Sequence, residues 1–167
     1  NSRDLLGDDF PPDELNRVEQ GHFYGWPYVN GFGVLDPDVG PGNEAKVSET
    51  TLPAHGFKPH NAPLGLAFLR STKLPPGYER TAIVALHGSW NRSTLDGYKV
   101  VALRWQADGT IVESDFLTGF LTDSKLIGRP AGVLEGPDGA IYVSIDANVR
   151  GVDGEATPVY RLVPVER

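Results

Sequence analysis

The hexapeptide HGSWNR, from His87 to Arg92, holds the densest set of reactive and binding side chains in the sequence. Flat polyanionic ligands are bound by such a set, because the indole of Trp90 stacks on them and the guanidinium of Arg92 pairs with their carboxylates. Nucleophilic catalysis by Ser89 is not favoured, since a Ser and a His so close in sequence rarely form a working pair and no G-x-S-x-G motif is present. The hexapeptide therefore predicts binding of an anion.

A second cluster lies near the start of the sequence, in GDDFPPDELNR from Gly7 to Arg17. Three carboxylates, Asp8, Asp9 and Asp13, surround a Pro-Pro pair that stiffens the turn. Calcium prefers several oxygen ligands from carboxylates and main-chain carbonyls, which a rigid turn directs toward one point. The spacing is not that of an EF-hand loop. Two interpretations stay open, a calcium-binding loop and a solvated acidic turn.

Three further basic side chains lie beside segments whose sequences predict strands. His60 precedes the apolar segment PLGLAF, His87 follows TAIVAL, and Arg129 opens the segment RPAGV. In all-β folds, loops at the strand ends converge on a rigid scaffold and form sites. We expect these three side chains at one end of the strands, although a structural role for each is equally compatible with the sequence. His22 and His55 have no such context.

The elements that would position these side chains are short strands. Thr81–Leu86 and Tyr98–Trp105 are rich in β-branched and apolar residues and flank a polar loop, and the same order returns in Ala140–Ile145 and Val159–Val163. The 20 Gly and 14 Pro are spread along the chain, which is typical of many turns. The sequence thus predicts an all-β fold with little helix.

Two Asp-Gly segments, QADGT and GPDGA, predict hairpin turns between strands. The aromatic segment FYGWPY, from Phe23 to Tyr28, is interpreted as another strand. Residues 31–63 show the least pattern and contain Pro and Gly throughout, so we interpret them as a long excursion between structural repeats. A loop of that length usually has a functional reason or a partner surface.

Composition removes several classes of function. The net charge of -7 disfavours nucleic acid and anionic membrane surfaces as partners. The absence of cysteine removes disulfides, thiolate nucleophiles and sulfur ligands, and leaves oxygen or His ligands for any metal. No apolar run approaches the roughly 20 residues of a membrane-spanning helix. We therefore expect a globular protein without a membrane span.

The order of five segments resembles the family of pyrroloquinoline quinone (PQQ)-dependent aldose, glucose and sorbosone dehydrogenases. Each segment alone is weak, but the ordered combination is specific and covers most of the chain. The segments are NSRDLLGDDFPPDELNR, GHFYGWPY, HNAPLGLAF, HGSWNR with GYKV, and GRPAGVLEGPDGAIYVS.

The resemblance implies a six-bladed β-propeller with consecutive four-stranded antiparallel blades. Because such a ring needs about 40 to 50 residues per blade, residues 1–167 are expected to be the C-terminal portion of one propeller domain, with 31–63 as the excursion between blades. An N-terminal half of the propeller would be the partner. The implied activity is oxidation of the anomeric or aldehyde carbon of a sugar, with hydride passed to PQQ above calcium and then electrons to an external acceptor. A periplasmic or secreted location is also implied.

The resemblance implies roles for individual residues as well. Asp13 would support the calcium loop. The implied calcium ligands, partly through main-chain carbonyls, are Gly7, Asp8 and Asp9. The implied PQQ contacts are His60, Trp90, Arg92 and Arg129.

The sequence departs from the family in lacking the catalytic His and the G-x-R-N-P segment. The chain is therefore expected to supply cofactor and calcium contacts without the catalytic base, and to be inactive in isolation. Two other functions remain open. One is a calcium-dependent, lactonase-like propeller hydrolase that uses no quinone, and the other is an inactive propeller that binds sugar or a protein partner.

Overall fold

The computed structural model describes residues 1–70, 74–123, 125–146 and 158–163, and the chain divides into two compact units. Unit 1 comprises residues 1–62 and 90–95, and unit 2 comprises residues 63–89 and 96–167. Unit 1 is therefore discontinuous in sequence. Its second segment is a loop that interrupts unit 2.

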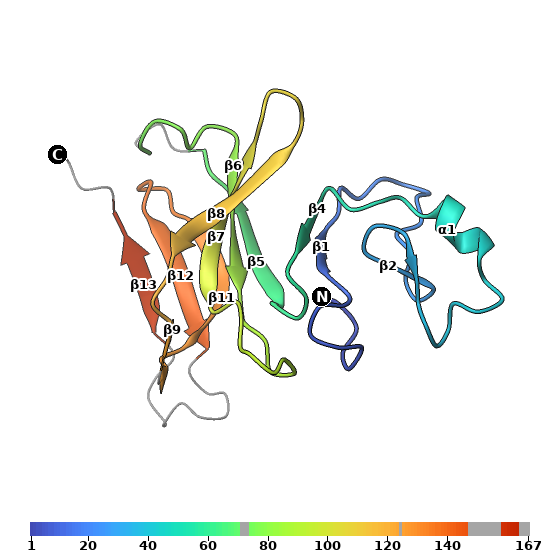
Figure 1. Ribbon diagram of the computed structural model, residues 1–167. Coiled ribbons are helices and arrows are strands. Elements are labelled where there is room, and N and C mark those ends of the chain that lie inside the picture. The colour runs from blue at the N-terminus through green and yellow to red at the C-terminus, as the bar shows by residue number, and fades with distance from the viewer. Residues whose placement is uncertain (71–73, 124, 147–157, 164–167) are drawn as a thin grey trace. The chain divides into compact units, whose positions relative to one another are not determined.

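The larger sheet of unit 2 contains four antiparallel strands in chain order (Figure 1). They are β5 (Pro63–Phe68), β6 (Thr81–Leu86), β7 (Lys99–Trp105) and β8 (Ile111–Leu117). All six residues of β6 are buried, as its uninterrupted apolar sequence requires. The predicted QADGT turn joins β7 to β8 and is closed by a 2.8 Å hydrogen bond from Gln106 N to Thr110 O. The strands predicted around TAIVAL and YKVVALRW are confirmed.

The second sheet of unit 2 contains β11 (Arg129–Glu135), β12 (Ile141–Asp146) and β13 (Val159–Leu162), all antiparallel. The GPDG turn joins β11 to β12, with Gly136 N donating to Ala140 O at 2.8 Å. A small hairpin, β9 (Leu121–Thr122) and β10 (Lys125–Leu126), precedes this sheet. Most of the polar loop predicted between β12 and β13, residues 147–157, lies outside the described residues. Four strands are thus present in one sheet, and three in the described part of the other.

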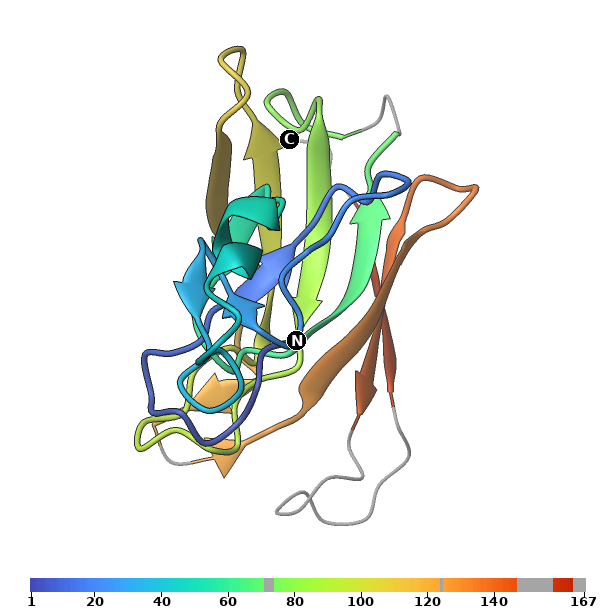
Figure 2. The same ribbon diagram turned by 90° about the vertical axis from the view of Figure 1, so that its right-hand side faces the viewer.

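The two sheets pack face to face, with β11 alongside β5, as Figure 2 shows from a second direction. Gly65 of β5 permits this approach, because a Cβ atom there would lie 2.7 Å from both Ala131 O and Val133 N. A buried cluster fills the unit. Its members are Leu69, Ile83, Tyr98, Val100, Phe120, Ile141, Val143 and Ile145.

Unit 1 is built from shorter elements. β1 (Asp13–Leu15) pairs with β4 (His55–Phe57), and β2 (Val29–Asn30) pairs with β3 (Val34–Leu35). The helix α1 (Ala45–Glu49) has five residues and is the one helix in the part of the chain that the structure describes. Residues 31–63, interpreted from sequence as an unpatterned excursion, thus contain β3, α1 and β4. The low helix content agrees with the sequence.

The aromatic segment FYGWPY does not form the predicted strand. It forms a turn in which Tyr28 N and Val29 N both donate to Gly25 O, at 2.8 and 2.9 Å. Gly25 adopts a φ of +93°, which an L residue rarely adopts, and a Cβ atom there would collide with Val29 O. Aromatic content suggested a strand, but the glycine inside the segment bends it.

Across the residues that the structure describes, no helix is long and apolar enough to cross a membrane.

Candidate functional site

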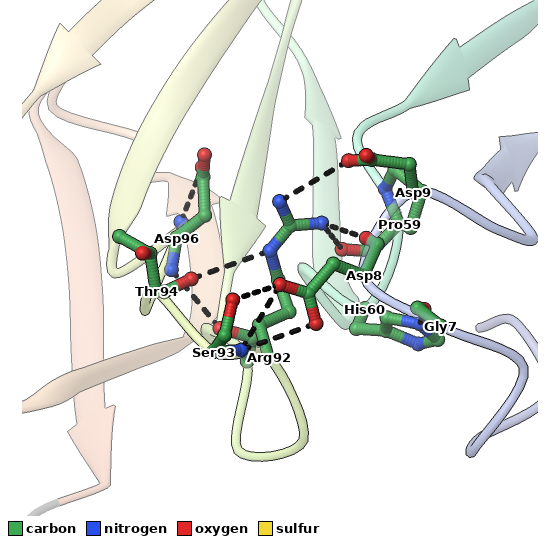
Figure 3. A network of polar contacts seen from close by, with 11 residues as sticks. Gly7, Asp8, Asp9, Pro59, His60, Arg92, Ser93, Thr94 and Asp96 are labelled. Carbon is green, nitrogen blue, oxygen red and sulfur yellow. Dashed lines mark hydrogen bonds and ion pairs between the residues drawn. The ribbon is translucent and has the colours of Figure 1, made fainter.

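In unit 1 the acidic turn is held by Arg92 (Figure 3). The guanidinium donates to the main-chain oxygen of Asp8 and, at 3.3 Å, to that of Pro59. It also lies 3.6 Å from the carboxylate of Asp9, while the Arg92 side chain is only 12% exposed. Arg92 Nε donates to Thr94 O at 3.3 Å. A single cation therefore joins the turn, the segment before His60 and its own loop.

Ser93 holds the Asp8 side chain in the same network. Its main-chain N–H lies 3.1 Å from each carboxylate oxygen of Asp8, and its hydroxyl donates to one of them. These hydrogen bonds, and then the nearby charge of Arg92, lower the pKa of Asp8. The Asp8 carboxylate is therefore ionised and oriented, whereas the Asp9 carboxylate is 96% exposed.

His60 contacts the other end of the turn. Its Nε2 lies 2.8 Å from Gly7 O, which accepts the hydrogen bond, and its side chain is buried. The main chain is in the left-handed region at His60 (φ +64°) and at Ala62 (φ +50°). Buried Asp13 stabilises this strained segment by accepting a 2.8 Å hydrogen bond from Ala62 N. Strain held in this way often occurs at ligand sites.

The carbonyls of Gly7 and Asp8, both predicted calcium ligands, therefore already accept hydrogen bonds from His60 and Arg92. Main-chain carbonyls are ligands that calcium uses, so the donor chemistry fits. A cation on these oxygens would have to replace the two N–H donors. Within the described ranges, no group of three or more His, Cys, Asp or Glu side chains is arranged to hold a metal.

In unit 2 the central feature is a buried cation, Arg129, the first residue of β11. It is 7% exposed. Its Nη1 donates to Gly88 O at 2.8 Å, and its guanidinium carbon lies 4.8 Å from the centre of the Tyr98 ring. The buried Nε has no hydrogen-bond partner, and no described carboxylate lies within ion-pair distance of Arg129. A buried guanidinium without a counter-ion favours binding of an anion.

Hydrogen bonds from Tyr98 and Asp96 to Ser89 hold together the two residues that flank the loop of residues 90–95. The Tyr98 hydroxyl donates to Ser89 O, and Ser89 Oγ accepts a 3.0 Å hydrogen bond from Asp96 N. Gly88 has a φ of +98°, and a Cβ atom there would lie 2.5 Å from the Tyr98 ring. Ser89 is fully buried. It closes the loop.

His87 lies beside this cation. Its Nε2 is 3.4 Å from Oδ2 of Asp146, the last residue of β12. In the register of β11 and β12, the main chain of Asp146 lies opposite that of Arg129. Burial lowers the pKa of His87 and the charge of Arg129 lowers it further, while Asp146 opposes both effects. Within unit 2, His87 and Arg129 thus occupy the same end of the strands. His60 belongs to unit 1 and stands three residues before β5 in the chain.

The structure brings together, within unit 1, five of the residues predicted from sequence: Gly7, Asp8, Asp9, His60 and Arg92. Trp90 is 67% exposed and takes no part in the network of Figure 3. Sequence reasoning missed Ser93 and Tyr98. Tyr98 follows Gly97 and has a φ of +53°, but a single aromatic residue before a strand carries no signal for a cation partner.

These features define an all-β protein with cationic and oxygen-rich clusters at strand ends. The chain belongs to the TrAA12-like family, whose model matches residues 42–150. This assignment confirms the resemblance to PQQ-dependent sugar dehydrogenases that the five sequence segments indicated.

Three relatives illustrate the family. An uncharacterized protein from Borreliella burgdorferi is 36% identical over 151 residues, which are 87% of this chain and 39% of that protein. A PQQ-dependent pyranose dehydrogenase from Coprinopsis cinerea is 32% identical over 111 residues, 54% of this chain and 14% of that enzyme. The crystal structure of the soluble aldose sugar dehydrogenase from Escherichia coli, in its apo form, superposes with a TM-score of 0.56 at 27% identity, covering 81% of this chain and 35% of that one. The chain thus spans well under half the length of these relatives.

Proposed function

We propose that the chain is part of a quinoprotein that oxidises the anomeric or aldehyde carbon of an aldose or related sugar with PQQ as cofactor. The observation that carries this proposal is Arg129, a buried cation with an unpartnered Nε and no described counter-ion. PQQ carries three carboxylates, and a fixed guanidinium is a suitable partner for one of them. The name of the Coprinopsis relative supplies the cofactor class.

Bound PQQ would supply the two-electron acceptor for the sugar. The residues of this chain would bind and orient it. Arg129 and Arg92 would pair with negative charge, because both are fixed by main-chain oxygens before any ligand arrives. Trp90 would offer an exposed ring for stacking, and His60 would contact the cofactor from its strained segment.

Calcium is the second cofactor of the proposal, with Gly7, Asp8 and Asp9 as ligands. Its support is the donor chemistry of the turn, which presents two main-chain oxygens and two carboxylates. A calcium titration of the Asp8→Ala and Asp9→Ala variants tests these ligands. A modest loss of affinity is expected for each, since main-chain oxygens would remain, and unchanged affinity in both variants would exclude the turn as the calcium site.

The wider assembly follows from the family resemblance. We propose a six-bladed propeller completed by an N-terminal half, an external electron acceptor and a periplasmic or secreted location. None of the four His residues is assigned the role of catalytic base, which the resemblance places in the N-terminal half. The chain alone is expected to be inactive with an aldose, PQQ, calcium and a redox dye, and the complementary half to restore dye reduction.

A binding test of PQQ addresses the proposal directly. In the protein with calcium present, PQQ should raise the melting temperature, because a ligand that binds only the folded state stabilises it. Arg129→Met should remove most of this increase, measured from the variant's own ligand-free melting temperature. The matched control is Arg104→Met, which alters an arginine hydrogen-bonded to Ser114 on β8. An undiminished PQQ effect in Arg129→Met would overturn the assignment of Arg129.

The lactonase-like hydrolase is the competing activity, and its substrate separates it from a dehydrogenase. Hydrolysis of a sugar lactone with calcium alone, without PQQ or dye, would favour it. Binding of sugar without either activity would favour an inactive binding module.

A further inference from the structure

Unit 1 contains a pocket to which the proposed function assigns no role. It has a volume of about 250 Å³, enough for one sugar ring, and residues 1–3 form part of its wall. The side chains that decide its chemistry are Arg3, Glu14, Asn16, Tyr24, Trp26 and Asn30. The proposed calcium ligands Gly7, Asp8 and Asp9 and the other labelled residues of Figure 3 do not line it.

The wall of the pocket is fixed by hydrogen bonds. Arg3 pairs with the buried Asp36 at 2.6 Å and also with Asp38. Asn30 is buried and donates to Asp36 at 3.0 Å. Because Arg3 already has two carboxylate partners, it offers no free positive charge to an anion. The side chain of Arg3 is therefore held in place and its charge is paired.

The side chain of Asn16 leaves a hydrogen-bond acceptor for a ligand. Asn16 Oδ1 is buried and has no hydrogen-bond partner, while its Nδ2 donates to Glu14 Oε2 at 2.9 Å. The other oxygen of Glu14 accepts from Gly31 N at 2.7 Å. A buried acceptor without a donor is costly, so a ligand that supplies a hydroxyl is favoured there. The hydroxyl of Tyr24 is already engaged with Arg17 O and Glu19 N.

The apolar part of the pocket is Trp26, which is 66% exposed. An exposed indole beside hydrogen-bond acceptors suits a molecule with one apolar face and several hydroxyl donors. A pyranose ring has this character, since its axial C–H groups form a face and its hydroxyls project from the edge.

We propose that this pocket binds a neutral saccharide, with the pyranose face on Trp26 and a hydroxyl donating to Asn16 Oδ1. The site is separate from the residues proposed to bind PQQ and calcium, and it does not depend on the proposed function. It would hold a second sugar unit or a glycan chain rather than the carbon that is oxidised.

Saturation-transfer NMR on the whole protein tests the site, with methyl β-D-glucopyranoside and methyl α-D-mannopyranoside as probes. Their blocked anomeric carbons prevent oxidation, and EDTA with no added PQQ keeps the proposed cofactor residues unloaded. Saturation transfer to at least one glycoside is expected. Trp26→Ala and Asn16→Ala should each weaken binding about tenfold or more, and Trp26→Phe should retain part of it. Thermal melting of each variant shows whether it is folded.

Phe32→Ala is the matched control, because Phe32 is an exposed aromatic residue of unit 1 that does not line the pocket and has no proposed role in cofactor binding. Absence of transfer to either glycoside overturns the proposal, as does loss of binding in Phe32→Ala with Trp26→Ala unaffected. Choline is a second probe, since a cation would also stack on Trp26 and pair with Glu14. Binding of choline that excludes the glycosides would assign the pocket to cations and overturn the saccharide site. Failure of PQQ to bind leaves this experiment unaffected.

Discussion

The guanidinium of Arg92 donates a hydrogen bond to the main-chain oxygen of Asp8, one of the oxygens proposed for calcium. Arginine and calcium would therefore compete for the same atom. We expect Arg92→Ala to bind calcium several-fold more tightly than the wild type in the absence of PQQ, because the competing cation is removed. Isothermal titration calorimetry measures this difference.

The control for that experiment is Arg17→Ala. It removes one positive charge from an exposed side chain of unit 1 whose ion pair is with Glu19, so it reports the general effect of charge on calcium binding. Equal increases in calcium affinity in both variants would mean that Arg92 does not compete with calcium for the main-chain oxygen of Asp8. A loss of affinity in Arg92→Ala would show that it shapes the turn instead.

The second prediction concerns the charge state of His87. Its pKa lies below the ordinary His value, mainly through burial, so NMR titration should find the neutral ring near pH 6.5. Because Asp146 opposes the shift, Asp146→Asn should lower the pKa of His87 further. Arg129→Met should raise it, since a nearby positive charge is removed. Shifts of the same sign in both variants would contradict the electrostatic assignment.

Asp36 provides a test of stability. Burial alone would raise its pKa, but hydrogen bonds from Val39 N, Asn30 and Asp38 N, together with Arg3, lower it well below the usual range. Its contribution to stability is therefore present above the ordinary Asp pKa and is lost as pH falls below it. Asp36→Asn should cost about 2–4 kcal/mol near pH 7.

Urea unfolding at several pH values measures this effect. The difference between wild type and Asp36→Asn should shrink as pH falls toward 2. Asp123→Asn, on an acid for which no ion pair is found among the described residues, is the control. A difference in the free energy of unfolding that stays constant with pH would indicate that Asp36→Asn disturbs the packing rather than removing a charge.

The packing of the two sheets of unit 2 depends on Gly65. An added methyl group would lie 2.7 Å from main-chain atoms of β11, which cannot move aside as a flexible side chain could. Gly65→Ala should therefore destabilise the protein by about 1–3 kcal/mol. Leu66→Ala, at a 43% exposed position on the same strand, should change stability less. Chemical denaturation compares the two, and equal effects would argue against the close approach.

The sequence predicted the strands of unit 2 well because their signals are local. TAIVAL is apolar throughout, and each Asp-Gly segment specifies its own turn. FYGWPY failed because aromatic content outweighed Gly25, whose left-handed conformation ends any strand there. Within residues 31–63, β3 has two residues and β4 has three, so their pairing comes from contacts across the unit rather than from periodicity.

The candidate site shows the same division between features that local sequence specifies and features that depend on the fold. Motif spacing identified Arg92, His60 and the acidic turn, and the structure shows that they touch. Neither the stacking of Arg129 on Tyr98 nor the clamp of Ser93 on Asp8 could be foreseen. Both depend on where the main chain turns in three dimensions, which residue types alone do not specify.

The loop of residues 90–95 is encoded between β6 and β7 but completes unit 1. During synthesis, the first 62 residues are therefore made before the arginine and serine that fasten their acidic turn. A gene fragment that ends at residue 62 would lack both, and a protease cut between β6 and β7 would sever the link. Unit 1 cannot be produced as a contiguous module, so evolution could exchange it only together with the strands that carry its last piece.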